Sequence, residues 1–246
     1  MKLFGRLYTC IRLTAVLVLP GAAFSQAAAT DSAIRAAGLA NAVSQFREHM
    51  GTALPLYSGP RYTYYYAQMK EGHPFFRSPM PHRGEVMFDN IFYPNLYLKY
   101  DMLMNKVVLT DSAHQVNTTL NNDKIDYFNI DKETFVKLYK TKNNGLPETD
   151  FYQVLFEGKN VTLYKKDQRK INEDSEHKRY IWADVSYYLK KGDTYYPVGT
   201  QGKALNAMDD KRAQLRSYIR SQNLSFREDV EDAVKATVSY YDSLLK

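Results

Sequence analysis

Cysteine is nearly absent from this chain of 246 residues. The one cysteine, Cys10, lies within the first 25 residues, a segment whose pattern predicts its removal. Without that segment the chain has no thiol, which excludes disulfide bonds, thiolate catalysis and cysteine-ligated zinc. A disulfide-free exported chain indicates a bacterial envelope rather than a small stapled extracellular module.

The motifs of several enzyme classes are missing as well. No two of the five histidines have the helical i, i+4 spacing and there is no His-Glu-x-x-His, so a zinc hydrolase has no local support. The sequence also lacks a Gly-x-Ser-x-Gly elbow and a phosphate-binding glycine loop. The acidic segment 121–126 lacks the glycine and final glutamate of a calcium loop, so we interpret it as a solvated turn. We expect no metal and no cofactor, and we assign no catalytic residue.

An excess of one charge is also lacking. The formal net charge is +6, but Lys2, Arg6 and Arg12 belong to the removable segment, and the remainder carries 30 basic and 27 acidic residues. A balance this even does not favour nucleic acid, whose binders concentrate Lys and Arg on one face. No apolar run after residue 25 is long enough to span a bilayer, so we expect no transmembrane segment in the mature chain.

The N-terminus has the layout of a secretory signal peptide over residues 1–25. The three basic residues precede an apolar run, 13–20, and small residues follow at Ala23 and Ser25. The mature chain is therefore expected to begin near Gln26. We predict export to the periplasm or the exterior of a Gram-negative bacterium.

Tyrosine is abundant, with 21 residues. Tyrosine favours the half-buried surface of strands, which is the simpler interpretation, but the same rings could form a platform for glycans or peptides. Short runs that alternate apolar and polar residues, separated by turn residues, predict an antiparallel β domain over residues 56–200. The expected strands cover residues 61–66, 85–89, 91–93, 96–100, 106–110, 125–130, 134–139, 151–156, 161–164, 180–189 and 194–198.

Helical patterns flank this domain on both sides. Residues 26–55 form an Ala-rich leader or short helix that Asp31 can cap, with Ile34, Val43 and Phe46 as a thin apolar stripe. Residues 201–246 form two amphipathic helices, the second with a capping-box pattern at Ser225-Phe-Arg-Glu228. The fold class is therefore mainly β (α+β): a curled antiparallel meander, as an open barrel or sandwich, with the helical pair packed on the sheet.

The loop 72–84 carries the strongest candidate site residues: His73, Arg77, His82 and Arg83. Three prolines stiffen the loop, which lowers the entropy cost of holding these side chains in place. The loop could bind an anion or carboxylate, since arginine presents a planar fork of donors. The alternative is a structural crossover in which Phe75 and Phe76 plug the core.

Two further features have a binding and a structural interpretation. The basic segment 159–170 could contact anionic lipid headgroups, or it could be a solvated run of lysines that protects a sheet edge. Trp182, the only tryptophan, could stack on a ligand, or it could be buried beneath the C-terminal helices.

Six segments rich in aromatic and turn residues follow one another along the chain. They are Leu56-Tyr-Ser-Gly59, Gly72-His-Pro-Phe-Phe76, Gly84-Glu-Val-Met-Phe-Asp89, Leu96-Tyr-Leu-Lys-Tyr-Asp101, Phe151-Tyr-Gln-Val-Leu-Phe-Glu-Gly158 and Ser239-Tyr-Tyr-Asp242. In this order they resemble a family of uncharacterised secreted proteins that is common in the Bacteroidetes, and the resemblance covers most of the mature chain. It implies a Gram-negative envelope location and implies no activity, cofactor or site residue.

These observations predict an exported, non-catalytic envelope protein that binds an apolar or extended ligand (lipid, glycan or peptide) or a partner protein. A hydrolase with a histidine-based site in the loop 72–84 is one alternative. A structural or assembly factor that docks a sheet edge onto a partner is another. A binder of apolar ligands should have a deep pocket, a hydrolase needs His73 or His82 beside an acid, and a docking protein needs a free edge or apolar patch.

Overall fold

The computed structural model describes residues 31–50, 55–64, 69, 71–111 and 116–245. Contacts divide the chain into two units, residues 1–50 and 51–246, and each is described by itself. The signal-peptide prediction lies outside the described residues. The first unit contributes helix α1 (Asp31–Met50), which begins at the predicted cap and exposes Ile34 and Leu39.

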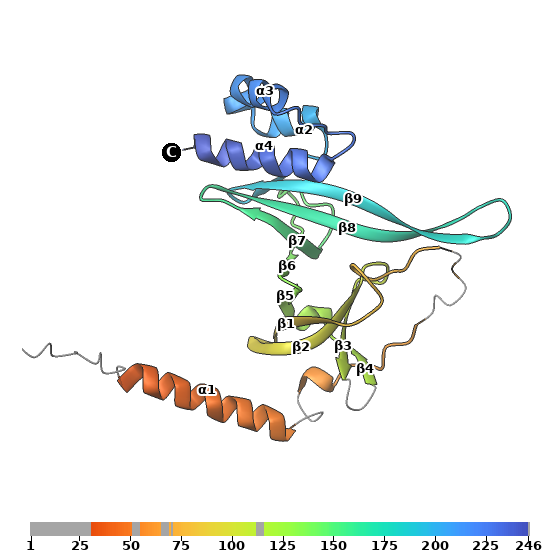
Figure 1. Cartoon of the computed structure of the whole chain (residues 1–246), viewed down its shortest axis with the longest axis vertical. Helices are drawn as coiled ribbons and strands as arrows, with labels where there is room; N and C mark the ends of the chain where they lie inside the picture. The colour runs from red at the N-terminus through yellow and green to blue at the C-terminus, as the bar shows by residue number, and fades with distance from the viewer. Residues whose placement is uncertain (1–30, 51–54, 65–68, 70, 112–115, 246) are drawn as a thin grey trace, which may run out of the picture. The chain divides into compact units, whose positions relative to one another are not determined.

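The second unit is built on one antiparallel sheet, which confirms the mainly β fold class (Figure 1). Its order is β10-β9-β8-β7-β6-β5-β1-β2-β3-β4, so two meanders meet where β1 pairs with β5. One turn connects β1 to β2, and its two central residues, Asp89 and Asn90, have the positive φ expected of a type I′ hairpin turn. The strands are β1 (His82–Phe88), β2 (Ile91–Asp101), β3 (Lys106–Asp111), β4 (Val116–Thr119), β5 (Ile125–Ile130), β6 (Glu133–Leu138), β7 (Asp150–Glu157), β8 (Val161–Glu173), β9 (Arg179–Lys191) and β10 (Thr194–Pro197).

The sheet curls but does not close into a barrel. The end of β2 reaches β8, where the Arg169 N–H donates to the Met102 carbonyl at 3.2 Å. Aromatic rings fill the inside of the curl, with Phe128 stacked on Phe135 at 4.9 Å between centroids and Tyr100 packed against both. This first core also includes Val86, Phe88, Leu98, Val107, Leu109, Leu120, Ile125, Ile130 and Phe151.

The predicted C-terminal helices are confirmed and cover one face of the second meander, as Figure 1 shows for α4 above β8 and β9. A 3-10 turn, η4 (Asp209–Lys211), divides the first predicted helix into α2 (Gln201–Ala207) and α3 (Arg212–Ser221). The second is α4 (Val230–Leu244), whose N-cap is Asp229 without a side-chain cap hydrogen bond. The predicted capping box therefore does not begin this helix, and the Glu228 N–H donates to Ser225 Oγ at 3.2 Å in the turn that precedes it. The second core joins both layers through Val161, Leu163, Leu189, Leu205, Met208, Leu215, Val234, Val238 and Tyr241.

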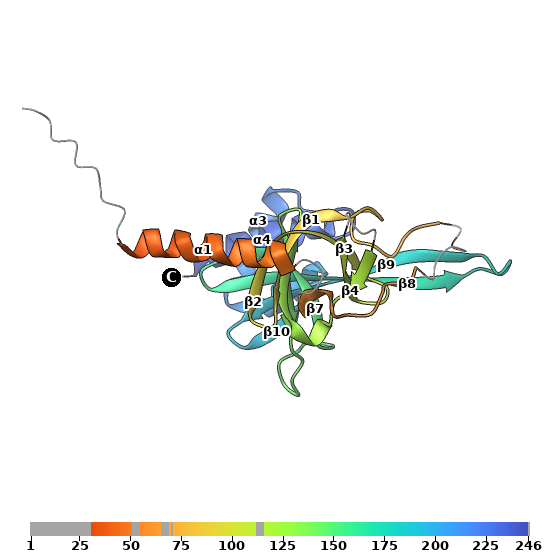
Figure 2. The ribbon, with the colours of Figure 1, turned by 90° about the horizontal axis from the view of Figure 1, so that it is seen from below.

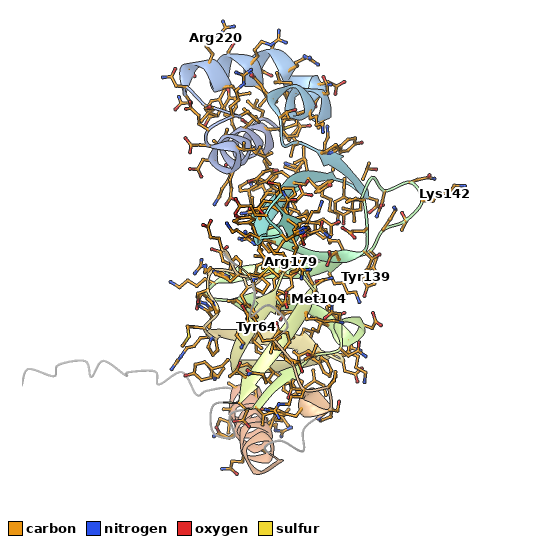
Figure 3. The ribbon with its side chains drawn as sticks, turned by 90° about the vertical axis from the view of Figure 1, so that its right-hand side faces the viewer. Tyr64, Met104, Tyr139, Lys142, Arg179 and Arg220 are labelled. Carbon is orange, nitrogen blue, oxygen red and sulfur yellow. The ribbon has the colours of Figure 1, made fainter. Side chains whose placement is uncertain are left out.

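The opposite face of the same strands holds a third, smaller core. Successive strand residues point to opposite faces, so Tyr164 and Tyr188 lie on the other side from Leu163 and Leu189. The β6–β7 loop, residues 139–149, crosses this face, places Leu146 in the third core and reaches β10, where the Tyr195 N–H donates to the Asn144 carbonyl. Lys142, labelled in Figure 3, lies at the tip of this loop and points away from the sheet.

Two strand predictions need correction. Residues 61–66 form no strand over their described part; Arg61 makes only an isolated bridge with Thr118, and residues 65–66 lie outside the described part of the chain. The strand predicted at 161–164 continues to Glu173 and pairs with β9 along its whole length. The basic segment 159–170 is therefore not at an edge, since β8 lies between β7 and β9.

Candidate functional site

The loop 72–84 pairs with the end of β2 and is anchored by its aromatic residues. The Phe76 N–H donates to the Tyr100 carbonyl, and the Met102 N–H donates to the Pro74 carbonyl, both at 2.8 Å. Phe75 is buried, and Phe76 packs edge-on against Phe135 with centroids 5.0 Å apart. Both rings therefore pack inward, as predicted by the alternative in which Phe75 and Phe76 plug the core. The same anchoring fixes the polar residues that follow them.

The structure brings together two of the four loop residues singled out in the sequence. His82 is the first residue of β1, and the side chain of Arg77 lies beside the same acid, Asp131. His73 lies apart, with its Nδ1 buried and without a hydrogen-bond partner among the described residues. The side chain of Arg83 is exposed and lines a hollow that Asp131 also borders.

His82 lies between a hydroxyl and a carboxylate. Its Nδ1 is 2.6 Å from Asp131 Oδ2, and its Nε2 is 2.8 Å from Ser78 Oγ. Because the carboxylate accepts the Nδ1 proton, Nε2 is the free acceptor and the serine hydroxyl donates to it. The β1–β5 pairing explains the position of the acid, since the Asp131 N–H donates to the Arg83 carbonyl at 3.0 Å.

Arg77 extends this arrangement into a network of charges. Its guanidinium lies 3.4 Å from Asp131 Oδ2 and 2.9 Å from Glu133 Oε1. The Gln153 amide donates to the other oxygen of Glu133 at 2.8 Å. We call Arg77, Ser78, His82, Asp131 and Glu133 the His82 cluster. It fastens the loop to the β5–β6 turn and to β6, and it places a hydroxyl, an imidazole and a carboxylate in sequence.

Trp182 lies far along the β8–β9 hairpin, which extends beyond the other strands in both ribbon views (Figures 1 and 2). Its side chain is 47 % exposed, so the interpretation that placed it beneath the C-terminal helices is wrong. The Lys170 ammonium lies 5.7 Å from the centre of the ring and pairs with Asp184, and Gln168 donates to Glu148 at 2.7 Å. We call Trp182, Lys170, Asp184 and Gln168 the Trp182 face.

The inner end of this face is a buried patch of tyrosines. Tyr152 and Tyr188 meet edge to face at 5.9 Å, and Tyr164 lies 6.0 Å from Tyr195. Burial raises the pKa of Tyr152, Tyr164 and Tyr188 above the ordinary value, so their hydroxyls stay neutral at physiological pH. Lys166, which belongs to the segment expected to be solvated, is buried here and pairs with Asp150 and Glu148.

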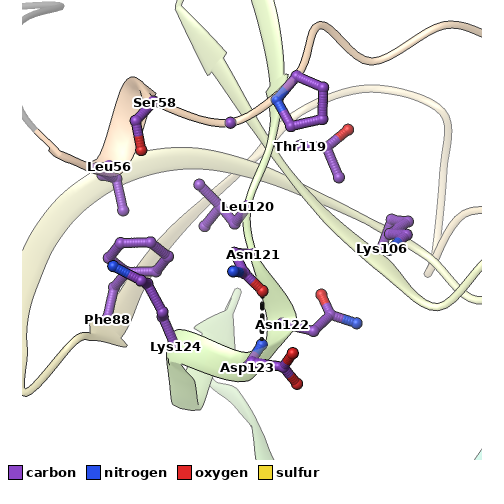
Figure 4. Close-up of a pocket in the computed structure, with 12 residues that line it drawn as sticks. Leu56, Ser58, Phe88, Lys106, Thr119, Leu120, Asn121, Asn122, Asp123 and Lys124 are labelled. Atoms are coloured by element: carbon purple, nitrogen blue, oxygen red, sulfur yellow. Dashed lines mark hydrogen bonds between the residues drawn. The ribbon is translucent and has the colours of Figure 1, made fainter.

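A hollow of about 450 Å³ opens at the other end of the sheet (Figure 4). Leu56, Phe88 and Leu120 form its apolar floor. Its rim includes the turn η3 (Asn122–Lys124), where Asn121 accepts the hydrogen bond from the Asp123 N–H that Figure 4 draws. Buried aromatic and aliphatic side chains fill the interior of the curl itself.

Short chain segments cover the sheet edges where the structure describes them. At β4, the Thr119 N–H donates to the Pro60 carbonyl, and at β10 the Asn144 carbonyl accepts from Tyr195. Along β9, the Ile181 N–H donates to the Glu71 carbonyl. A partner strand would have to displace these segments, which disfavours docking through the described edges.

Comparisons with known proteins supply no further guide: no family model, no curated protein and no solved structure matches this chain. In the part of the chain that the structure describes, no helix is long and apolar enough to cross a membrane. No group of three or more His, Cys, Asp or Glu side chains there is placed to hold a metal ion.

Proposed function

We propose that this chain is an exported binding protein of the bacterial envelope, and that its ligand is an extended glycan that lies along the Trp182 face. One observation carries the proposal. The only tryptophan of the chain is 47 % exposed on the hairpin formed by β8 and β9, with Lys170 paired opposite it and the Gln168–Asp184 pair next along the hairpin.

The chemistry of this face suits a sugar polymer. An exposed indole offers a flat apolar surface on which the apolar face of a sugar ring can stack. Lys170 supplies donors, the Asp184 carboxylate supplies acceptors, and the Gln168 amide supplies both, which matches the hydroxyl groups around such a ring. A few well-placed polar groups around an aromatic surface are typical of sites that fix the orientation of a ligand.

The structure gives less support to the other ligand classes considered from the sequence. A lipid requires an apolar cavity, but aromatic side chains fill the inside of the curled sheet. A peptide that adds a strand requires a free edge, but Glu71 already pairs with β9 close to Trp182. A glycan needs neither. Export rests on the signal-peptide pattern of residues 1–25.

Intrinsic fluorescence tests the proposal directly because all tryptophan emission comes from Trp182. We would titrate the mature chain with the hexasaccharides cellohexaose, chitohexaose and maltohexaose. At least one is expected to give a saturable change in emission. The Trp182→Ala variant, followed by calorimetry, should bind that sugar about tenfold or more weakly, as expected for loss of a central aromatic contact.

The matched control is Tyr97→Ala, which removes an exposed aromatic ring from β2 in the other meander. It should leave the affinity unchanged. Equal binding by the Trp182→Ala variant and the native chain would overturn the site. A fluorescence response to unstructured peptides but to none of the sugars would overturn the ligand class.

A further inference from the structure

The order of groups in the His82 cluster has a chemical meaning beyond fastening a loop. A hydroxyl, an imidazole and a carboxylate follow one another at 2.8 Å and 2.6 Å, both within hydrogen-bond reach. We infer that Ser78, His82 and Asp131 form an acyl-transfer centre that cleaves small esters, such as acetate esters of an alcohol that carries further hydroxyl groups. Such centres are recognised by geometry and role, not by chain order or fold.

Each group has the partner that its role requires. Asp131 accepts the Nδ1 proton of His82, which leaves Nε2 as the base that faces the Ser78 hydroxyl. The side chains of His82 and Asp131 are 19 % and 30 % exposed, so the pair is partly shielded from water. The acid cannot swing away easily, because its backbone N–H is bound to the Arg83 carbonyl in the β1–β5 ladder.

The segment that carries the nucleophile is rigid. Pro79 and Pro81 fix two φ angles and have no N–H, so Met80 carries the only backbone donor between Ser78 and His82. That N–H lies 3.3 Å from Ser78 Oγ. It donates to Oγ itself in this structure, and in the tetrahedral intermediate it would have to turn from Oγ to the adjacent oxyanion. Arg77, which precedes the serine, has a φ of 57°, an uncommon conformation for a side chain of this size.

The reaction consumes one ester and one water. His82 Nε2 accepts the Ser78 proton while Oγ attacks the ester carbonyl, and Asp131 stabilises the imidazolium. The tetrahedral intermediate expels the alcohol, which takes the proton from Nε2 and leaves an acyl group on Oγ. Water then gives its proton to Nε2 and attacks the acyl carbon. Collapse releases the carboxylic acid and returns the proton to Ser78.

The surroundings indicate the class of substrate. The centre is open and has one backbone donor, which favours small, unhindered acyl groups over long chains or amides. Asp131 also borders a hollow of about 480 Å³ that is lined by Arg83, Asn129 and Lys132. Asn129 Oδ1 is buried there without a hydrogen-bond partner among the described residues, so it can accept from a hydroxyl of the leaving alcohol.

The test uses a fluorescent fluorophosphonate, which phosphonylates an activated serine, followed by peptide mass spectrometry. We expect one adduct, on Ser78. Ser78→Ala should abolish it, and His82→Asn should slow it by about a hundredfold or more, the usual contribution of a general base. Ser58→Ala, which removes another turn serine, should label normally.

A cluster that only holds the loop would give a different result. Labelling no faster than that of the urea-unfolded chain, or labelling that persists in Ser78→Ala, would overturn the inference. If His82→Asn fails to fold, Ser78→Ala decides, because it removes one hydroxyl and keeps the His82–Asp131 pair. The Trp182→Ala variant should label like the native chain, so the failure of the glycan proposal and the failure of this one are separable.

Discussion

The two ends of the β8–β9 hairpin follow the same alternation of residues but have different surroundings. Near the helices, Leu163 and Leu189 lie under α4, and Tyr188 lies under the loop that carries Leu146. At the far end, Ile171 and Trp182 point to opposite faces and both remain exposed. The alternation of residues along the strands therefore does not determine which residues of this hairpin are buried. The covering layers decide it, and they leave Ile171 and Trp182 at the far end exposed.

Substitution of two lysines on one face of β8 should give the largest difference in the free energy of unfolding between the two ends. The Lys166 side chain is 5 % exposed and pairs with the buried Asp150, whereas that of Lys170 is 50 % exposed and pairs with Asp184. Lys166→Ala leaves a buried carboxylate unpaired and should lower the free energy of unfolding by about 3–5 kcal/mol. Lys170→Ala should lower it by less than about 1 kcal/mol. Urea unfolding measures both, and equal losses would contradict the comparison.

The pH dependence of stability sharpens this prediction. The hydrogen bond from Lys166 lowers the pKa of Glu148. A carboxylate with a lowered pKa in the folded state stabilises the protein above its unfolded pKa, and this contribution is lost as the pH falls through the folded value. The urea midpoint of the native chain should therefore fall more steeply below about pH 4.5 than that of Lys166→Ala. Parallel pH profiles would show that Glu148 does not depend on Lys166.

Substitution of two apolar residues on the opposite face of the hairpin should give the next largest difference in the free energy of unfolding. Leu189 is fully buried beneath the helices, and Ile171 is 44 % exposed. Leu189→Ala should cost about 2–5 kcal/mol because it opens a cavity in a packed core. Ile171→Ala should cost less than about 1 kcal/mol, since the far end has no covering layer to lose. A large loss for Ile171→Ala, measured by urea unfolding, would indicate that the far end is packed in solution.

Local patterns predict most of the sheet because turns and alternation are local properties. The β5 strand has the predicted bounds, and the turn at Gly192 has the positive φ expected of its glycine. The length of β8 could not be predicted in this way, since residues 165–173 are mainly polar and charged and are held by β9 rather than by their own pattern. The β1–β5 pairing was also missed, because no local signal links strands so far apart in the chain.

That long-range pairing explains what the sequence could and could not predict about the His82 cluster. Arg77 and His82 were identified because they share a stiff loop. Ser78 carries no local signal, since a lone serine outside a Gly-x-Ser-x-Gly context does not mark a nucleophile. Asp131 was placed in a turn, but only the β1–β5 register brings that turn to His82. The exposure of Trp182 likewise has no local signal, since it depends on how far the β6–β7 loop covers the face of the hairpin that carries Tyr188.

The smallest expected contrast concerns the two aspartates that anchor the turns at the two ends of β8. Asp242 of α4 accepts from the N–H groups of Lys159, Asn160 and Val161 at 3.0, 2.8 and 3.2 Å. Asp174 accepts from the N–H groups of Glu176 and Lys178 in its own turn and from the Tyr180 hydroxyl of the neighbouring strand. Asp242→Ala should therefore cost about 1–3 kcal/mol of global stability. Asp174→Ala should loosen only the tip, which amide hydrogen exchange would detect without a shift in the urea midpoint.

The anchor at Asp242 also makes the global stability depend on pH. Burial by itself would raise the pKa of Asp242, but the hydrogen bonds from the Asn160, Lys159 and Val161 N–H groups outweigh it and lower the pKa. The contribution of Asp242 is thus present above the unfolded pKa and lost as the pH falls through the lowered folded value.

Gly158→Ala offers an independent test, since its Cβ would lie 2.5 Å from the Asp242 carboxylate and push it out of the turn. If Gly158→Ala and Asp242→Ala each lower the urea midpoint and the double variant adds nothing, the helix layer stabilises the near end through this carboxylate. Additive losses would instead mean that the helix and the turn act separately.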